Sequence, residues 1–475
     1  MKIVNTFFIL FAGFAFQACS SHPDKTAAKD QQNKETPAIV LETFPTGQVI
    51  DKVNCKSDTS QSFAMYLPKG YDLKKTYPII YAFDAHGTGK LPVADYKDLA
   101  EKYGYIIVGS NNSQNGTSWE QSQAIAATLF SDTKNRLAID EHRVYLMGFS
   151  GGARVANALT IANGYVAGVI CCGAANPAVN AMNPRNNYTF FGIAGDADFN
   201  YTEMHKYDLV DLAGHDVKHA VISFEGKHEW PPMTVMEEAF VWEELDNMRK
   251  NPTTKNDAMI QAGLKTETNK LNALLKENKE YEAYELCRKD INFYEKLDNL
   301  TLFYDAYKKL KTSAAVDHQL KLNELAWSRE EKMKGSYMDA LQTQNYEWWV
   351  KDIASVNQKI KTGKDKDEVA VEERVLSYLS LVCYMQTNGM LKQNNVIAAE
   401  YYCKLYKLVD PKNTEADYLM AEIKAKQADG DAAIKALNES VKNGFTDVKR
   451  LESDSAFNML QSDPKFIKVK ESIRK

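Results

Sequence analysis

Residues 143–154 read RVYLMGFSGGAR, an apolar run that leads into a serine surrounded by glycines. The run Arg143–Met147 predicts a buried strand, and the small residues after Gly152 predict a helix. Ser150 is therefore expected at a sharp strand-to-helix turn. Gly148 and Gly152 flank it in the pattern G-x-S-x-G, because larger side chains there would collide with the neighbouring strand and helix. Glycine-rich turns of this kind also bind phosphates, so the stretch alone leaves two interpretations open.

Apolar runs on both sides of this stretch predict the rest of a mostly parallel sheet. Continuously apolar strands that alternate with helical patterns are typical of an α/β fold with helices on both faces of the sheet. The first two strands, Val49–Val53 and Ser62–Leu67, have no helix between them and are expected to form an antiparallel edge. The other expected strands are Tyr77–Asp84, Tyr105–Ser110, Val166–Cys172, Thr189–Ala194 and Ala220–Phe224.

The distribution of helix breakers divides the chain near residue 250. Residues 1–250 hold 18 of the 24 glycines and 10 of the 13 prolines. We therefore expect an α/β domain over residues 41–250 and an all-α region over residues 257–475. From about residue 394, Asp410-Pro411 and Gly430-Asp431 punctuate paired helices in a way that resembles tetratricopeptide-type repeats. The net charge of −5 is dispersed and argues against a nucleic-acid partner.

The first residues have the layout of a secretory signal. A lysine is followed by the mostly apolar run Ile3–Phe16, which is too short to span a bilayer. Phe16-Gln17-Ala18-Cys19 resembles the cleavage site of bacterial lipoproteins, which implies a signal peptide over residues 1–18 and lipidation of Cys19. Residues 19–40 then form a polar tether. This predicts a lipid-anchored protein of the bacterial cell envelope, at the outer membrane. The alternative is an ordinary signal peptide with an incidental Cys19.

Two downstream motifs supply the partners that a serine nucleophile needs. GDADFNY places Asp198 just beyond a strand, with Asp196 as the rival carboxylate. GKHEWPP places His228 after the next strand. The order serine, acid, histidine is the one required by a nucleophile at a strand-to-helix turn of this type. The sequence therefore predicts Ser150, Asp198 and His228 as a catalytic triad.

A third motif, DAHGTG, follows the strand Tyr77–Asp84. Acyl transfer needs two backbone N–H donors for the oxyanion. Gly151, the residue after the nucleophile, is expected to supply one donor, and Thr88 in this loop the other. His86 and Asp84 are expected to hold the loop by hydrogen bonds.

These motifs together resemble an α/β-hydrolase of the esterase type that includes polyhydroxybutyrate depolymerases and feruloyl esterases. The resemblance covers about Ser60 to Met248 and rests on HGTG, GFSGGAR, GDADFNY and GKHEWPP. It implies an α/β-hydrolase sheet and a serine carboxylic-ester hydrolase that needs no cofactor or metal. The chain lacks the disulfide pattern of the secreted depolymerases and carries a helical region in place of a polymer-binding module, which makes a polyester substrate doubtful.

The substrate is expected to be a small-molecule or carbohydrate-linked ester. Asn111 and Asn112, in the loop after strand Tyr105–Ser110, are candidates for substrate contact, as are His86 and Trp230. For the asparagines the alternative is a polar surface loop, and for Trp230 an anchor of its loop.

Two other functions stay open at this point. The helical region could bind a protein partner while the α/β domain serves as a scaffold. The same triad could also cleave amides, which would make the protein a serine peptidase.

Overall fold

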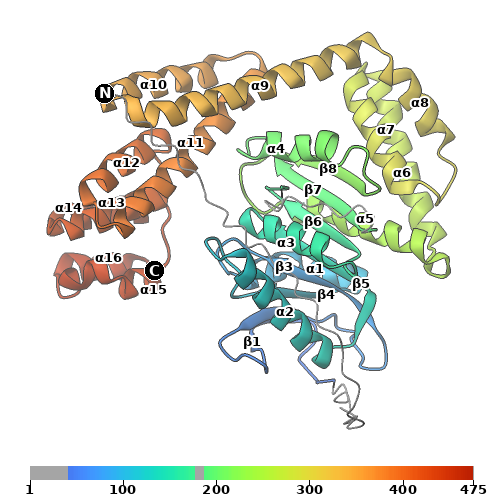
Figure 1. Cartoon of the computed structure of the whole chain (residues 1–475), viewed down its shortest axis with the longest axis horizontal. Helices are drawn as coiled ribbons and strands as arrows, with labels where there is room; N and C mark the ends of the chain where they lie inside the picture. Colours follow the sequence, from blue (N-terminus) through green and yellow to red (C-terminus); the bar gives the residue numbers. More distant parts are fainter. Residues whose placement is uncertain (1–40, 177–186, 474–475) are drawn as a thin grey trace, which may run out of the picture. The chain divides into compact units, whose positions relative to one another are not determined.

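The computed structural model describes residues 41–176 and 187–473, so the expected signal peptide and Cys19 lie outside the described residues. In Figure 1 the strands occupy the first half of the chain, and the yellow-to-red second half is helical. No helix in the described part of the chain is long and apolar enough to cross a bilayer.

An eight-stranded sheet forms the centre of the α/β part, with the strand order β1-β2-β4-β3-β5-β6-β7-β8. Strands β3 to β8 run parallel, and β2 is antiparallel to both β1 and β4. The expected antiparallel edge is thus confirmed, and the order is that of the predicted α/β-hydrolase sheet. The strands are β1 Val49–Asn54, β2 Ser62–Tyr66, β3 Tyr77–Phe83, β4 Ile106–Ser110, β5 Ile139–Phe149, β6 Gly168–Cys172, β7 Thr189–Gly195 and β8 Lys218–Phe224.

Helices cover both faces of this sheet because successive strand residues point to opposite sides. Cys171 packs in the core beneath helices α2 (Trp119–Arg136) and α3 (Gly151–Ala162). Its neighbour Cys172 packs in the opposite core, beneath α1 (Lys90–Tyr103) and α5 (Met233–Lys250). Both cysteines are buried and unpaired, as their place on a strand predicts.

The helical pattern of the sequence predicts a helix over Thr202–Ala213, but the α-helix in the structure is shorter. The α-helix α4 covers only Tyr201–Lys206, and the chain continues as a π-helical turn over Tyr207–Asp211. The ring of Tyr207 packs 5.0 Å from that of Phe190 on β7. Its hydroxyl accepts a hydrogen bond from Asn157 Nδ2 at 3.0 Å. These contacts hold the wider turn against the sheet.

Beyond Lys250 the chain is helical to the end of the described residues. The first three helices, α6 to α8, contribute buried residues to the same core as α1 and α5, so no break in packing follows α5. Residues from Leu41 onward accordingly form one compact unit. The helices are α6 Asp257–Lys276, α7 Glu280–Tyr294, α8 Thr301–Lys311, α9 Ala314–Thr343, α10 Tyr346–Thr362, α11 Lys366–Lys392, α12 Val396–Val409, α13 Thr414–Lys426, α14 Gly430–Lys442, α15 Val448–Ser453 and α16 Pro464–Ile473.

Candidate active site

Ser150 stands at the turn between β5 and α3 with a strained backbone. Its φ and ψ are 55° and −122°, a region that residues with a side chain rarely adopt. The two flanking glycines make the turn sterically feasible. A Cβ on Gly148 would lie 2.3 Å from the carbonyl oxygen of Gly152, and a Cβ on Gly152 would lie 2.0 Å from that of Phe83.

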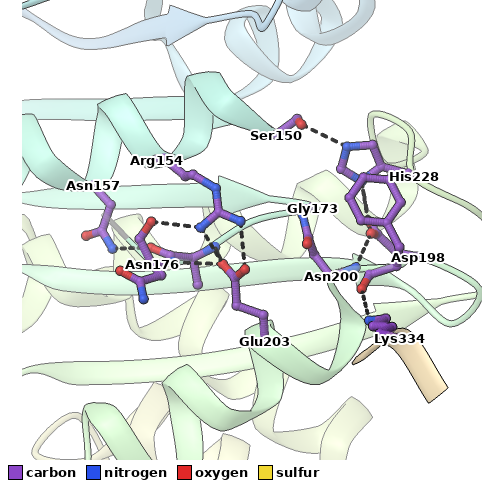
Figure 2. Close-up of polar contacts among 12 residues, drawn as sticks. Ser150, Arg154, Asn157, Gly173, Asn176, Asp198, Asn200, Glu203, His228 and Lys334 are labelled. Carbon is purple, nitrogen blue, oxygen red and sulfur yellow. Dashed lines mark hydrogen bonds and ion pairs between the residues drawn. The ribbon is translucent and has the colours of Figure 1, made fainter. Parts of the chain in front are cut away.

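The structure brings Ser150, His228 and Asp198 together in one hydrogen-bonded line (Figure 2). Ser150 Oγ lies 2.8 Å from His228 Nε2. His228 Nδ1 lies 2.9 Å from each carboxylate oxygen of Asp198. The side chain of His228 is 17% exposed and that of Asp198 is fully buried. A carboxylate on Nδ1 favours the tautomer whose free Nε2 can accept the serine proton.

Asp196, the rival carboxylate, is exposed and serves its own loop. Its Oδ1 accepts a hydrogen bond from the N–H of Gly226 at 3.0 Å. Asp198 Oδ1, in contrast, accepts the N–H of Asn200 at 2.8 Å, in addition to its contact with His228. The Asn200 side chain donates to the carbonyl of Gly173 at 2.7 Å, which ties the turn of Asp198 to the end of β6.

Aromatic rings enclose the imidazole of His228. The ring centroid of Phe199 lies 4.1 Å from that of His228, and the ring centroid of Phe149 lies 4.7 Å from it. Trp230 packs on Phe149 at 5.5 Å and donates its indole N–H to Asp84 Oδ2 at 3.1 Å. Trp230 therefore anchors its loop, one of the two roles expected for it.

The buried carboxylate of Asp84 organises the loop after β3. Its Oδ1 accepts the N–H of His86 at 2.9 Å and lies 3.4 Å from the N–H of Thr88. The side chain of His86 is 76% exposed, and its interaction with Asp84 raises the pKa of the imidazole. The structure thus turns the Thr88 N–H toward Asp84, and its role as an oxyanion donor stays a prediction. Gly151 is the first residue of α3, where helix N–H groups lack partners within the helix.

Two asparagines of the loop after β4 bind backbone groups of the neighbouring strands. The side chain of Asn112 accepts the N–H of Ser62 at 2.8 Å, and that of Asn111 donates to the carbonyl of Asp51 at 3.3 Å. Both therefore hold the loop to β1 and β2. Asn115, in the same loop, was not among the residues predicted from the sequence. A Cβ on Gly151 would lie 1.8 Å from Asn115 Oδ1, so this carboxamide occupies the space beside the residue that follows the nucleophile.

A partly exposed ion pair links the helices that follow Ser150 and Asp198 (Figure 2). Arg154 on α3 forms two hydrogen bonds with Glu203 on α4, at 2.7 and 2.6 Å. Burial raises the pKa of Glu203, but Arg154 and two backbone N–H groups together outweigh it and lower the pKa overall. Glu203 also accepts the N–H groups of Ala175 and Asn176 at 3.2 and 3.1 Å. This bidentate pair fixes the spacing of the two helices.

The described residues contain no group of three or more His, Cys, Asp or Glu side chains arranged to hold a metal ion.

Comparisons with known proteins found similarity to solved structures at low identity. No protein-family model and no curated protein sequence matches the chain. Among solved structures, an S-formylglutathione hydrolase from Agrobacterium tumefaciens matches at 14% identity and a TM-score of 0.33, covering 41% of this chain and 93% of its own. An esterase from Pyrobaculum calidifontis matches at 12% identity and a TM-score of 0.33. The match covers 44% of this chain and 88% of the esterase. The feruloyl esterase module from Clostridium thermocellum matches at 19% identity and a TM-score of 0.30. The match covers 41% of this chain and 87% of the module. The assignment of the fold rests on the strand order itself.

Proposed function

We propose that this protein is a serine hydrolase that cleaves carboxylic esters through an acyl-enzyme. The observation that carries the proposal is the line from Ser150 Oγ through His228 to the buried Asp198, built on a strained turn at Ser150. Strain and pre-formed hydrogen bonds at one residue are typical of a nucleophile. We propose no metal or cofactor for the reaction.

In the first step, Ser150 Oγ attacks the ester carbonyl while its proton passes to His228 Nε2. Asp198 accepts the hydrogen bond from Nδ1–H and stabilises the imidazolium that forms. The N–H of Gly151 and a donor from the loop after β3, for which we retain Thr88, bind the oxyanion. The imidazolium then gives its proton to the leaving alcohol. In the second step His228 activates a water molecule, which releases the acid and restores Ser150.

The proposed substrate is a small-molecule or carbohydrate-linked ester, and a peptide amide is the alternative for the same triad. We further propose that the protein acts as a lipoprotein in the cell envelope and that the helical region offers a surface to a protein partner. These last points rest on the sequence features near Cys19 and after residue 394.

Labelling with a fluorophosphonate tests the proposal directly. Wild type is expected to react at Ser150, whereas Ser150→Ala is not. Ser131→Ala, which changes an exposed serine on α2, is the matched control and should label normally. Ser150→Ala should also lower hydrolysis of p-nitrophenyl acetate about a thousandfold or more. Absence of labelling in wild type would instead favour a scaffold.

A substrate panel then separates the ester and amide alternatives. Turnover of p-nitrophenyl acetate and methyl ferulate with no turnover of a peptide p-nitroanilide supports the esterase. Faster turnover of the anilide would identify a peptidase.

A further inference from the structure

The loop that carries Asp198 is held by side chains from the helical region. Lys334 Nζ, on α9, donates to the carbonyl of Phe199 at 2.7 Å (Figure 2). Arg374 Nη1, on α11, donates to the carbonyl of Asp196 at 3.1 Å. These two carbonyls lie on either side of Asp198 in the chain, so the loop is bound on both flanks of the acid.

A single buried carboxylate holds both cations in place. Glu330 on α9 is fully buried. Its Oε1 lies 2.6 Å from Lys334 Nζ, and its Oε2 lies 2.7 Å from Arg374 Nε. The same Oε2 accepts the hydroxyl of Thr202, on α4, at 2.9 Å. Because each group is paired and largely removed from water, their mutual geometry is strongly restrained.

The restraint reaches the imidazole through Phe199. This residue offers its carbonyl to Lys334 and its ring to His228, at a centroid distance of 4.1 Å. Displacing the carbonyl would therefore shift both Asp198, which precedes Phe199, and the ring that packs on the base. The guanidinium of Arg374 also lies 4.7 Å from the ring centroid of Tyr201, which begins α4 directly after this loop.

We infer that Lys334 and Arg374 are positioning residues for the triad, and that the helical region thereby completes the active site. The inference rests on the proposed function, in which Asp198 orients His228. The helical region then does more than offer a surface to a protein partner, because α9 and α11 set the geometry of Asp198.

The test compares three variants of the full chain. Lys334→Met removes the donor to Phe199, and Lys334→Arg keeps a cation of similar reach. Lys332→Met is the matched control, because Lys332 is exposed on the same helix. Lys334→Met is expected to lower kcat for p-nitrophenyl acetate about tenfold or more, with KM within about twofold, since misplaced catalytic groups affect the chemical step. Lys334→Arg should recover most of kcat, and Lys332→Met should equal wild type.

A second readout does not depend on turnover. The proton on His228 Nδ1, which faces Asp198 at 2.9 Å, is expected to give a low-field proton NMR signal, which Asp198→Asn assigns by its loss. Lys334→Met is expected to shift or broaden this signal, and Lys332→Met to leave it unchanged. An unaltered signal together with an unaltered kcat would overturn the inference. If wild type neither labels nor hydrolyses esters, the proposed function fails, and the NMR signal still decides whether Lys334 positions Asp198.

Discussion

Phe199 lies against His228 with 4.1 Å between the ring centroids, directly after the residue that orients the same imidazole. One residue thus limits how far the base can tilt away from Ser150. We predict that Phe199→Ala lowers kcat for p-nitrophenyl acetate by about tenfold, because small misplacements of a catalytic group reduce rate strongly. Phe130→Ala is the control. Phe130, on α2, packs against Tyr81 with 4.5 Å between the ring centroids. This variant should therefore lose stability and keep kcat per folded molecule. Equal kcat losses in both variants would contradict the assignment.

Gly173, directly after β6, has no side chain, and Asp198 and His228 lie close to where its side chain would be. Its φ is +65°, and a Cβ there would lie 3.0 Å from Asp198 Oδ2 and 3.1 Å from His228 Cε1. We predict that Gly173→Ala lowers kcat by about tenfold to a hundredfold, because the carboxylate or the imidazole must move. The positive φ adds a loss of about 1 kcal/mol or more in the free energy of unfolding. Steady-state kinetics and urea denaturation measure the two effects.

Gly104 separates these two effects of the substitution. Its φ is +73°, similar to that of Gly173, but a Cβ there would meet no atom within 4 Å. Gly104→Ala should therefore lower stability by a similar amount and leave kcat unchanged. A kcat loss in Gly104→Ala as large as that in Gly173→Ala would show that general destabilisation, rather than contact with the triad, causes it.

The carboxamide of Asn115 sits beside Gly151, where the oxyanion is expected to form. We predict that Asn115→Ala lowers kcat about tenfold or more, and that Asn115→Asp lowers it further, because a carboxylate would repel the developing negative charge. Gln114→Ala, which changes the exposed neighbouring side chain, should have little effect. Pre-steady-state acylation rates provide the measurement. A faster rate in Asn115→Asp than in Asn115→Ala would refute this role.

Local patterns were sufficient to predict the sheet and the turn at Ser150. The helical pattern of the sequence predicts a helix over Trp119–Arg136, and α2 has these bounds. Ser118 and Gln121 form a capping box where this helix begins. The prediction of a helix over Thr202–Ala213 was wrong in its second half, where the chain forms a π-helical turn. There the wider turn depends on contacts of Tyr207 with β7 and α3, which are remote in sequence.

The groups that support the site could not be predicted in this way. Lys334 lies 135 residues after Phe199, so no local pattern links the two. The chain holds 58 Lys and Arg and 63 Asp and Glu, so no spacing in the sequence identifies Glu330 as the buried partner of Lys334 and Arg374. Only tertiary packing of α9 and α11 decides that pairing. The loop after β4 shows the same limit, since its sequence indicates polar residues but not which asparagine lies beside Gly151.

Glu243, on α5, predicts how stability depends on pH. It is fully buried beneath β7, where Thr189 donates to its Oε2 at 2.8 Å. Burial raises the pKa of this carboxyl from 4.5 to about 8. Between these values the folded protein keeps a proton that the unfolded chain releases, so this group costs roughly 1.4 kcal/mol of unfolding free energy per pH unit as pH rises. Glu243→Gln removes the titration and keeps an acceptor for Thr189. Urea denaturation should therefore show an advantage for Glu243→Gln that grows from pH 5 and levels off above about pH 8. An advantage that stays constant over this range would mean that Glu243 is ionised in the folded protein throughout.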